Sequence, residues 1–287
     1  MTVRVVVLMT AHNRRATTVA CLERLRDQRP CDADIRVVLV DDASTDGTAR
    51  AAARVGLPLQ VIRGPGDLYW AGGMQWADMA AVRQAPDAFV WLNDDVLLDQ
   101  DAVLRMLAVA AQYPEAIVVG ATRSSVDSSL TYGGRRRAST WHPQRFELLP
   151  LSDRVQTADT FNGNVVLVPM GVRQLVGPID GRFPHAYADD DYGLRARQHD
   201  VQILQAPGTV GVCERNQQVA PIRGLRSWRT AQASKGTPLA AQIRFFRRHG
   251  GRAWPLILFG QQVRQMLPAG HGSRAEDVQD GLSEETT

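Results

Sequence analysis

Two acidic clusters in this sequence have residue types and positions that suit chemistry. The first is Asn93-Asp94-Asp95, which directly follows the apolar run AFVWL at residues 88–92. Charged side chains next to a buried strand are costly unless a cation or solvent compensates them. Carboxylate oxygens are ligands that Mg²⁺ and Mn²⁺ prefer. Asp95 is therefore the predicted ligand of a divalent ion that would bridge the protein to a diphosphate; a turn capped by one aspartate is the alternative.

The second cluster is Asp189-Asp190-Asp191, at the start of a predicted helix over residues 189–198. Acidic residues in a first helical turn are favoured by the helix dipole, so a structural cap is one interpretation. Three adjoining carboxylates also repel one another, which raises the pKa of at least one and makes a general base plausible. His185, just before this cluster, is a weaker site candidate because a core or surface histidine explains it equally well.

A third polar segment, DDASTDGT at residues 41–48, follows a predicted strand. Asp, Ser and Gly are also what a tight strand-to-helix turn requires. In the functional interpretation, Asp41 accepts hydrogen bonds from the imide or ribose hydroxyls of a nucleotide. The segment has neither GxGxxG nor GxxxxGK[ST], which weighs against a nicotinamide dehydrogenase.

The stretch DLYWAGGMQWADMA, residues 67–80, places two adjacent glycines before a predicted helix. Gly72 and Gly73 would let backbone N–H groups approach an anionic ligand at the helix N-terminus, or they are packing glycines. The aromatic residues Tyr69, Trp70 and Trp76 either belong to the core or form a wall on which a sugar stacks.

The elements that position these residues alternate between strand and helix over the first hundred residues. Strand-like runs at 3–9, 35–40, 59–62 and 88–92 alternate with helical patterns around 19–25, at 48–55 and at 74–85. This order predicts a parallel sheet covered by helices on both faces, with its ligand site beyond the carboxyl ends of the strands. The second half predicts strands at 116–122, 165–169 and 202–213, with a glycine-arginine turn at 133–137.

The composition limits the size of the core, the class of partner and the cellular compartment. The 287 residues are 44% hydrophobic, which is enough for one substantial core. The chain has 33 basic and 30 acidic residues, and the resulting formal charge of +3 does not predict a nucleic-acid partner. Cys21, Cys31 and Cys213 are too widely spaced to indicate a disulfide framework or a CxxC metal site, which favours the cytoplasm. The first residues lack the order of a signal peptide and read as a strand.

Taken in order, MTAHNRR, VDDASTDGT, a GG-helix segment, LNDDV and ADDDYGLRA resemble family 2 glycosyltransferases. The resemblance covers about residues 3 to 250 and implies a GT-A fold with a Rossmann-like, mostly parallel central sheet. It also implies an inverting, nucleotide-sugar-dependent enzyme that transfers a hexosyl or deoxyhexosyl group in the synthesis of a glycan, cell-surface polysaccharide or glycoconjugate.

The resemblance also assigns roles to individual residues. Asp95 matches the metal-binding carboxylate of the family's DxD motif, in which Asn93 replaces the usual first aspartate. Asp189 inherits the role of catalytic base, and Ala188 stands where an acid usually precedes it. Donor contacts are expected from Thr10, His12, Asn13, Arg14, Asp41, Gly72, Gly73, Asn93, Asp94 and Arg248. The acceptor side is expected to include Trp70, Asn162, His185, Asp190 and Asp191.

The implied partners are a UDP- or dTDP-linked sugar donor, an acceptor with a hydroxyl group and a divalent Mg²⁺ or Mn²⁺ cofactor. Two alternatives stay open. The departures at Asn93 and Ala188 would suit a nucleotide-sugar-binding protein without turnover. A sugar-nucleotide pyrophosphorylase is less well supported, because TAHNRRATT lacks the glycine-rich loop of that class.

The expected organisation is a catalytic domain over residues 1–222, with a nucleotide-sugar half at about 1–100 and an acceptor half at about 101–222. A basic helical extension at 223–268 and a disordered tail at 269–287 would follow. RAWPLILFG at 252–260 is too short to span a bilayer, but its neighbouring arginines suit an anionic lipid surface. We therefore expect a cytoplasmic protein, with peripheral contact at the inner face of the membrane as an alternative to packing on the catalytic domain. Oligomeric state is not predicted.

Overall fold

The computed structural model describes residues 2–139, 141–184, 186–215, 224–233 and 238–267. Its strands are β1 (Val3–Ala11), β2 (Ala33–Asp41), β3 (Leu59–Arg63), β4 (Ala88–Leu92), β5 (Leu97–Leu98), β6 (Ile117–Arg123), β7 (Leu130–Tyr132), β8 (Gly134–Arg137), β9 (Phe146–Leu148), β10 (Gln156–Thr157), β11 (Thr160–Phe161), β12 (Val165–Pro169) and β13 (Ile203–Val212). Its helices are α1 (Arg15–Arg26), α2 (Thr48–Ala52), α3 (Tyr69–Ala81), the 3₁₀ turn η1 (Val82–Gln84), α4 (Ala102–Gln112), α5 (Met170–Val176), α6 (Ala188–Gln198), α7 (Leu225–Ala233), α8 (Leu239–His249) and α9 (Trp254–Met266).

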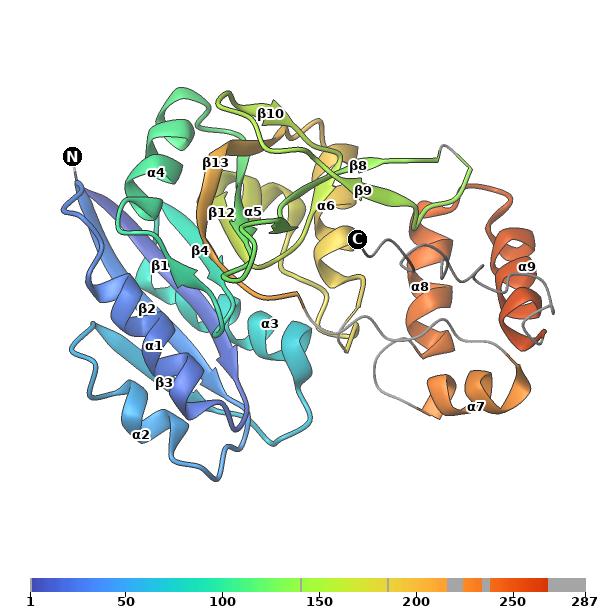
Figure 1. The fold of residues 1–287 in the computed structure, drawn as a ribbon, viewed down its shortest axis with the longest axis horizontal. Helices are drawn as coiled ribbons and strands as arrows, with labels where there is room; N and C mark the ends of the chain where they lie inside the picture. Colours follow the sequence, from blue (N-terminus) through green and yellow to red (C-terminus); the bar gives the residue numbers. More distant parts are fainter. Residues whose placement is uncertain (1, 140, 185, 216–223, 234–237, 268–287) are drawn as a thin grey trace, which may run out of the picture.

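The main sheet has the strand order β10-β13-β6-β12-β4-β1-β2-β3. The neighbours β4, β1, β2 and β3 pair in parallel, and β6 pairs in parallel with β13. β12 is antiparallel to both β4 and β6, so β6 and β13 run in the same direction as the first four strands. The expected mostly parallel sheet is therefore confirmed (Figure 1).

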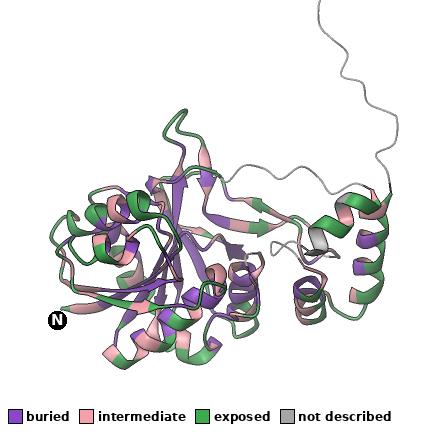
Figure 2. Ribbon diagram, turned by 90° about the horizontal axis from the view of Figure 1, so that it is seen from below, coloured by how far each residue is buried: buried purple, intermediate pink, exposed green. Residues whose placement is uncertain are grey.

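Alternate residues of the strands bury against helices on opposite faces of this sheet. On β1, Val5 and Val7 pack in the cluster that includes buried side chains of α1, α2 and α4. Val6 and Leu8 pack in the cluster that includes α3, α5 and α6. Because side chains alternate along a strand, nearly continuous apolar runs such as VRVVVLM are what a sheet covered on both faces requires. Figure 2 shows this buried sheet between its helices.

A smaller sheet of order β11-β8-β9 lies beside the main one. Its middle strand β8 covers residues for which the sequence predicted a turn, so that prediction was wrong. The Gly134 N–H donates to Gln205 Oε1 at 2.8 Å, which ties the start of β8 to β13 of the main sheet. A short strand rich in arginine has no apolar alternation, and for this reason the sequence pattern does not reveal it.

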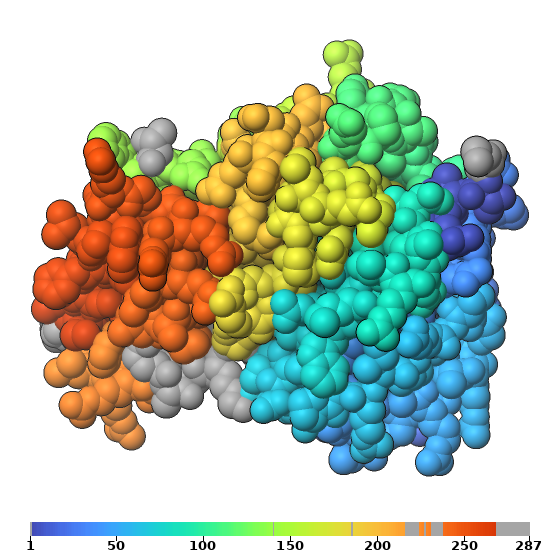
Figure 3. All heavy atoms as spheres, turned by 180° about the vertical axis from the view of Figure 1, so that it is seen from behind, coloured from blue at the N-terminus to red at the C-terminus, as the bar shows by residue number. Residues whose placement is uncertain are grey.

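Helices α7, α8 and α9 form the expected C-terminal helical extension, a lobe beside the sheet domain (Figure 3). Asp191 of α6 has a fully buried side chain that binds three groups, Arg195 Nε at 2.9 Å, Arg248 Nη1 at 2.5 Å and His249 Nε2 at 2.9 Å. Arg248 Nη2 also lies 3.1 Å from Asp180 Oδ2. The contacts of Arg248 and His249 hold α8 against the sheet domain. The exact domain boundaries stay a prediction, and residues 269–287 lie outside the described residues.

Candidate active site

A cleft with a volume of about 710 Å³ opens where β1, β2 and β4 end. The carboxyl ends of these parallel strands meet at one edge of the sheet, which is where open α/β sheets bind ligands. The lining residues are Thr10, Ala11, His12, Arg14, Asp42, Gly66, Tyr69, Trp70, Asn93, Asp94, Asp95, Tyr132, Asn162, Gly163, Asn164 and Asp189. The cleft therefore brings the first acidic cluster together with Asp189, one residue of the second.

One wall of the cleft carries two carboxylates and an arginine. Arg14 Nη2 donates to Asp95 Oδ2 at 2.7 Å, and Arg14 Nε lies 3.1 Å from Asp94 Oδ2. Thr18 Oγ1 donates to the same Asp94 oxygen at 3.3 Å. Burial raises the pKa of Asp94 to about 6, Arg14 opposes this shift and the neighbouring charge of Asp95 adds to it. Arg14 thus compensates the negative charge that follows the buried strand β4.

The side chains on this wall differ in how available they are to a metal ion. Asn93 Oδ1 accepts a hydrogen bond from Trp70 Nε1 at 2.7 Å. The side chain of Asp95 is 26% exposed, against 10% for Asp94. In the described part of the chain, no three His, Cys, Asp or Glu side chains converge as a ligand set. One exposed carboxylate fits Mg²⁺ or Mn²⁺ if the remaining ligands are phosphate oxygens and water, so Asp95 is the residue that would hold the ion.

Asp189 reaches the same cleft from the start of α6. Its Oδ2 accepts a hydrogen bond from the Gly163 N–H at 3.1 Å, and its Oδ1 accepts one from the Asp190 N–H at 2.9 Å. A Cβ on Gly163 would lie 2.6 Å from the ring of Trp70 and 3.3 Å from the Asp189 Cβ. Only glycine therefore allows the loop between β11 and β12 to pass between the indole and the carboxylate.

Asp189 and Asp190 are adjacent but face different partners. Asp190 binds Arg135 Nη1 with both oxygens, at 2.9 and 2.8 Å, and does not line the cleft. Burial raises the pKa of Asp189, and it raises the pKa of Asp190 to about 7; Arg135 opposes both shifts. A carboxylate with a raised pKa is a better proton acceptor, which suits Asp189 for general base catalysis.

The two aspartates at the end of β2 have separate structural roles. Asp42 lines the cleft, and its carboxylate accepts hydrogen bonds from the backbone N–H groups of Gly66, Leu68 and Tyr69 at 2.7, 2.9 and 3.3 Å. Asp41 accepts one from the Ser44 N–H at 3.2 Å and does not line the cleft. The sequence prediction chose Asp41 as a donor contact, and the structure places its neighbour Asp42, not Asp41, in the lining of the cleft.

Backbone conformation around the cleft is unusual at several loops. Asn13, Ala43, Tyr69 and Tyr187 all have positive φ, at 51°, 57°, 55° and 78°. Residues with side chains rarely adopt this left-handed region, and such strain gathers at sites where side chains must be aimed. Each of these residues directly flanks a strand end or a helix start that supplies a cleft residue.

The cleft does not include every residue predicted from the sequence. Gly72 and Gly73 lie inside α3 rather than before it, and a Cβ on Gly73 would lie 2.1 Å from Thr10 Oγ1, so this glycine serves the packing of α3 on β1. Arg248 and Asp191 bind each other away from the cleft lining. Asn13 also lies outside the lining, and His185 lies outside the described residues.

Several cleft residues were not among those predicted from the sequence. Asp42, Gly163 and Asn164 adjoin predicted residues, and the motifs DD and NGN could have pointed to them. Tyr132 comes from β7, a short strand whose position beside the site depends on the pairing of β7 with β6.

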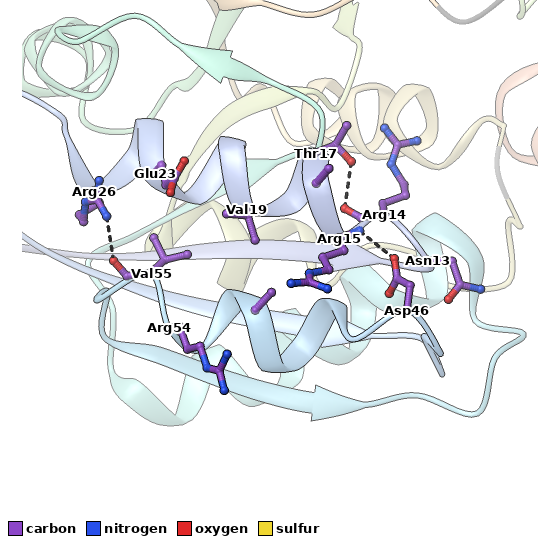
Figure 4. Close-up of a pocket in the computed structure, with 12 residues that line it drawn as sticks. Asn13, Arg14, Arg15, Thr17, Val19, Glu23, Arg26, Asp46, Arg54 and Val55 are labelled. Atoms are coloured by element: carbon purple, nitrogen blue, oxygen red, sulfur yellow. Dashed lines mark hydrogen bonds between the residues drawn. The ribbon is translucent and has the colours of Figure 1, made fainter.

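A second groove, of about 790 Å³, runs between α1 and α2 (Figure 4). Asn13 lines it together with Arg15, Arg26 and Arg54. The Arg15 N–H donates to Asp46 Oδ2 at 2.9 Å, and Arg26 donates to the Val55 carbonyl at 3.1 Å. These groups hold α1 to α2, and the two carboxylates that line the groove, Glu23 and Asp46, are outnumbered by four arginines.

Comparison with known proteins identifies the family. The model of the family described as glycosyl transferase family 2 matches residues 6–168, more than half of the chain. This chain belongs to glycosyl transferase family 2. The match contains every cleft residue from Thr10 to Asn164 and ends before Asp189, so the assignment of the base rests on geometry rather than on the match.

Solved structures of glycosyltransferases share the GT-A fold of this family 2 chain. S. aureus TarS residues 1–349 superimposes with a TM-score of 0.55 at 14% identity, over 73% of this chain and 60% of that fragment. The mannosyltransferase PcManGT from Pyrobaculum calidifontis, in complex with GDP-Man and Mn²⁺, gives a TM-score of 0.53 at 18% identity, over 92% of this chain and 74% of that one. The chain thus spans about 60% of the TarS fragment. A search of curated proteins finds no match.

None of the helices in the described ranges has the length and apolar composition needed to cross a bilayer. The three cysteines are free, and Cys213 Sγ lies 3.6 Å from Asp95 Oδ1.

Proposed function

We propose that this glycosyltransferase binds a nucleoside-diphosphate sugar in the 710 Å³ cleft and transfers the sugar to an acceptor hydroxyl with inversion. The observation that carries the proposal is that Asp189 and Asp95, which belong to distant parts of the sequence, line one cleft. A single displacement needs a proton acceptor at the attacking hydroxyl and positive charge at the leaving diphosphate. These two residues, with Arg14, supply groups for both tasks.

Asp189 acts as the base. Its carboxylate takes the proton from the acceptor hydroxyl while that oxygen attacks the anomeric carbon from the face opposite the diphosphate. The hydrogen bonds from the Gly163 and Asp190 N–H groups hold both carboxylate oxygens in place. In the same step the bond between the anomeric carbon and the diphosphate oxygen breaks, the diphosphate leaves with its electron pair, and no covalent sugar intermediate forms.

The negative charge that develops on the leaving diphosphate is stabilised by cations beside Asp94 and Asp95. Arg14 can donate to a phosphate oxygen from its present position between Asp94 and Asp95. A divalent Mg²⁺ or Mn²⁺ held by Asp95 would act as a Lewis acid toward the departing diphosphate. The structural neighbour PcManGT is described with Mn²⁺, which supports this cofactor.

The donor is proposed to be UDP- or dTDP-linked and to carry a hexosyl or deoxyhexosyl group. One TarS structure is described in complex with UDP, whereas PcManGT is described with GDP-Man, so the fold accommodates more than one base. Trp70 offers an indole face in the cleft on which a sugar ring can stack. The acceptor would then approach near Asn162, and the product would belong to a glycan, a cell-surface polysaccharide or a glycoconjugate made in the cytoplasm.

Calorimetric titration with UDP, dTDP, GDP and CDP, each with Mn²⁺ or with EDTA, tests the proposal. We expect one or two nucleotides to bind selectively and more tightly with Mn²⁺. Asp95→Ala should remove the metal-dependent part of the affinity, while Asp127→Ala, which changes an exposed aspartate on a loop outside the cleft, should leave it intact. If no nucleoside diphosphate binds, the cleft is not a donor site and the proposal fails.

Turnover separates the enzyme from a protein that only binds nucleotide sugars, an alternative suggested by Asn93 and Ala188. If wild-type protein binds a nucleoside diphosphate but releases none from any UDP-, dTDP- or GDP-linked sugar, the binding protein is the better description.

A further inference from the structure

The outward face of α9 is apolar. Leu256, Phe259, Val263 and, just after the helix, Leu267 are 76%, 68%, 38% and 55% exposed. Residues spaced by three or four positions lie on the same side of a helix, so these four side chains form one stripe along its length. Figure 2 shows the exposed outer surface of this helix at the end of the molecule farthest from the N-terminus.

The opposite face of α9 fixes this orientation. Leu258 is buried, and the buried Gln262 donates from Nε2 to Gln242 Oε1 at 2.9 Å. The Gln262 Oε1 accepts a hydrogen bond from Trp228 Nε1 at 2.9 Å. Rotation of the helix to bury the apolar stripe would break this chain of buried hydrogen bonds, which links α7, α8 and α9. The stripe is therefore held toward the outside.

The charge of the same extension is strongly one-sided. Residues 224–267 contain seven arginines, one lysine and no aspartate or glutamate, although the whole chain has a formal charge of only +3. Arg244 and Arg248 pair with Asp180. Five further arginines are exposed and have no carboxylate partner within the described residues, namely Arg226, Arg229, Arg247, Arg252 and Arg264. Among the described residues, the apolar stripe thus belongs to a lobe whose positive charge is only partly balanced by carboxylates.

We propose that α9 docks this protein on an anionic lipid surface. A helix with exposed leucine and phenylalanine beside arginine lies in the plane of a membrane interface, with its apolar side chains among the acyl chains and its cations on the headgroups. The positive charge selects this occupant over a second copy of the chain, because a symmetric contact through α9 would bring two positively charged lobes together. The inference does not depend on the proposed reaction.

Docking of α9 on a membrane would also affect the cleft, because α8 of the same lobe is attached to α6. The contacts of Asp191 with Arg248 and His249 join α8 directly to α6, the helix whose first turn presents Asp189 to the cleft. A lipid surface bound to α9 would hold the base at a set position relative to the membrane.

Co-sedimentation of the full-length protein with vesicles tests the proposal. We expect binding to mixed phosphatidylcholine and phosphatidylglycerol vesicles, weaker binding at high salt and little binding to phosphatidylcholine alone. The double variant Leu256→Ser with Phe259→Ser should bind about tenfold more weakly, because it removes the two most exposed apolar side chains of the stripe. A matched control, Met79→Ser with Leu175→Ser, changes apolar residues that are 60% and 54% exposed on the sheet domain and should bind like wild type.

A second pair, Arg252→Gln with Arg264→Gln, should weaken binding to the anionic vesicles while leaving the apolar stripe unchanged. Thermal melting establishes that each variant is folded, and sedimentation velocity without lipid reports the oligomeric state. Equal vesicle binding by wild type and the Leu256/Phe259 double variant would overturn the proposal. So would a wild-type dimer that this double variant dissociates, or a wild-type protein that binds none of the vesicles.

Discussion

Asp189 and Asp190 show how one step along a helix changes the task of a carboxylate. Asp189 lines the cleft and accepts two backbone N–H hydrogen bonds, whereas Asp190 is held by Arg135. Burial raises the pKa of both carboxyl groups. The geometry, rather than the pKa, decides that Asp189 is the proposed base.

The pH dependence of turnover follows from the environment of Asp189. Only the deprotonated carboxylate can accept a proton, so kcat/KM should rise as pH increases through the pKa of this group. Because burial raises that pKa above 3.8, the rising limb should lie above the range of an ordinary aspartate. The measurement is kcat/KM for release of nucleoside diphosphate across the pH range in which the protein stays folded. A rising limb centred at or below 3.8 would contradict the assignment.

For individual residues, the sequence indicated which segments supply the cleft better than which side chain of a segment points into it. Asp189, Asp95, Arg14 and Trp70 line the cleft as expected. Asp41 does not: it is the last residue of β2, its carboxylate accepts a hydrogen bond from the Ser44 N–H, and the carboxylate that lines the cleft is that of the next residue. Two adjacent aspartates at a strand end look alike in the sequence, so the structure is needed to tell Asp41 from Asp42.

At the scale of elements, the packing of α3 on β1 depends on Gly73. Gly73→Ala would place a Cβ 2.1 Å from Thr10 Oγ1, so strand and helix must move apart. We expect the free energy of unfolding to fall by about 1–3 kcal/mol, as is usual for overpacked sites, and the binding of nucleoside diphosphate to weaken because Thr10 lines the cleft. Urea denaturation and calorimetry measure the two effects.

Gly171→Ala is the matched control, since a Cβ at this position in α5 meets nothing within 4 Å. Its unfolding free energy should stay the same or rise slightly, by up to about 1 kcal/mol. Equal destabilisation by both substitutions would show that loss of glycine, rather than crowding against Thr10, is responsible.

The contact of α8 with α6 gives a second prediction for elements. Arg248→Met removes a cation from Asp180 and from the buried Asp191, which keeps Arg195 and His249 as partners. The free energy of unfolding should fall by about 1–3 kcal/mol, while the Kd for nucleoside diphosphate stays within twofold of wild type. Thermal melting and calorimetry provide the readouts.

Arg247→Met changes the exposed neighbour and should alter stability by no more than about 0.5 kcal/mol. If Arg248→Met instead abolished nucleotide binding and left stability unchanged, Arg248 would be a donor-binding residue, as the family resemblance implied.

Elements with a strong apolar pattern were predictable from the sequence. The runs at 3–9, 35–40 and 88–92 became β1, β2 and β4, with ends that differ by a few residues. Weakly patterned elements were not predictable: β8 is short and carries three arginines, and its strand conformation depends on pairing with β9 and β11. The 252–260 segment was expected to pack on the catalytic domain, but α9, which contains most of it, contacts mainly α7 and α8. This segment begins α9, which packs through Leu258 and leaves Leu256 and Phe259 exposed.

For the whole molecule, the order of motifs was sufficient to predict the GT-A fold and the edge of the sheet at which the cleft lies. Parallel strands must end at one edge, so polar residues after the first, second and fourth strands had to converge there. The arrangement of the second half could not be predicted in this way, because the reversed strand β12 and the small sheet depend on long-range pairing. Asp189 and Asp95 line the same cleft because of this long-range strand pairing.

Turnover by an Asp189→Asn variant tests the central claim most directly. The readout is release of nucleoside diphosphate from the preferred nucleotide sugar, with water or a supplied alcohol as acceptor, alongside the Kd for the nucleoside diphosphate. We predict a rate about 10²- to 10⁴-fold below wild type, the usual contribution of a general base, with the Kd unchanged. Asp153→Asn, at an exposed position outside the cleft, should match wild type in both respects. An Asp189→Asn protein that releases nucleoside diphosphate at the wild-type rate would contradict the account.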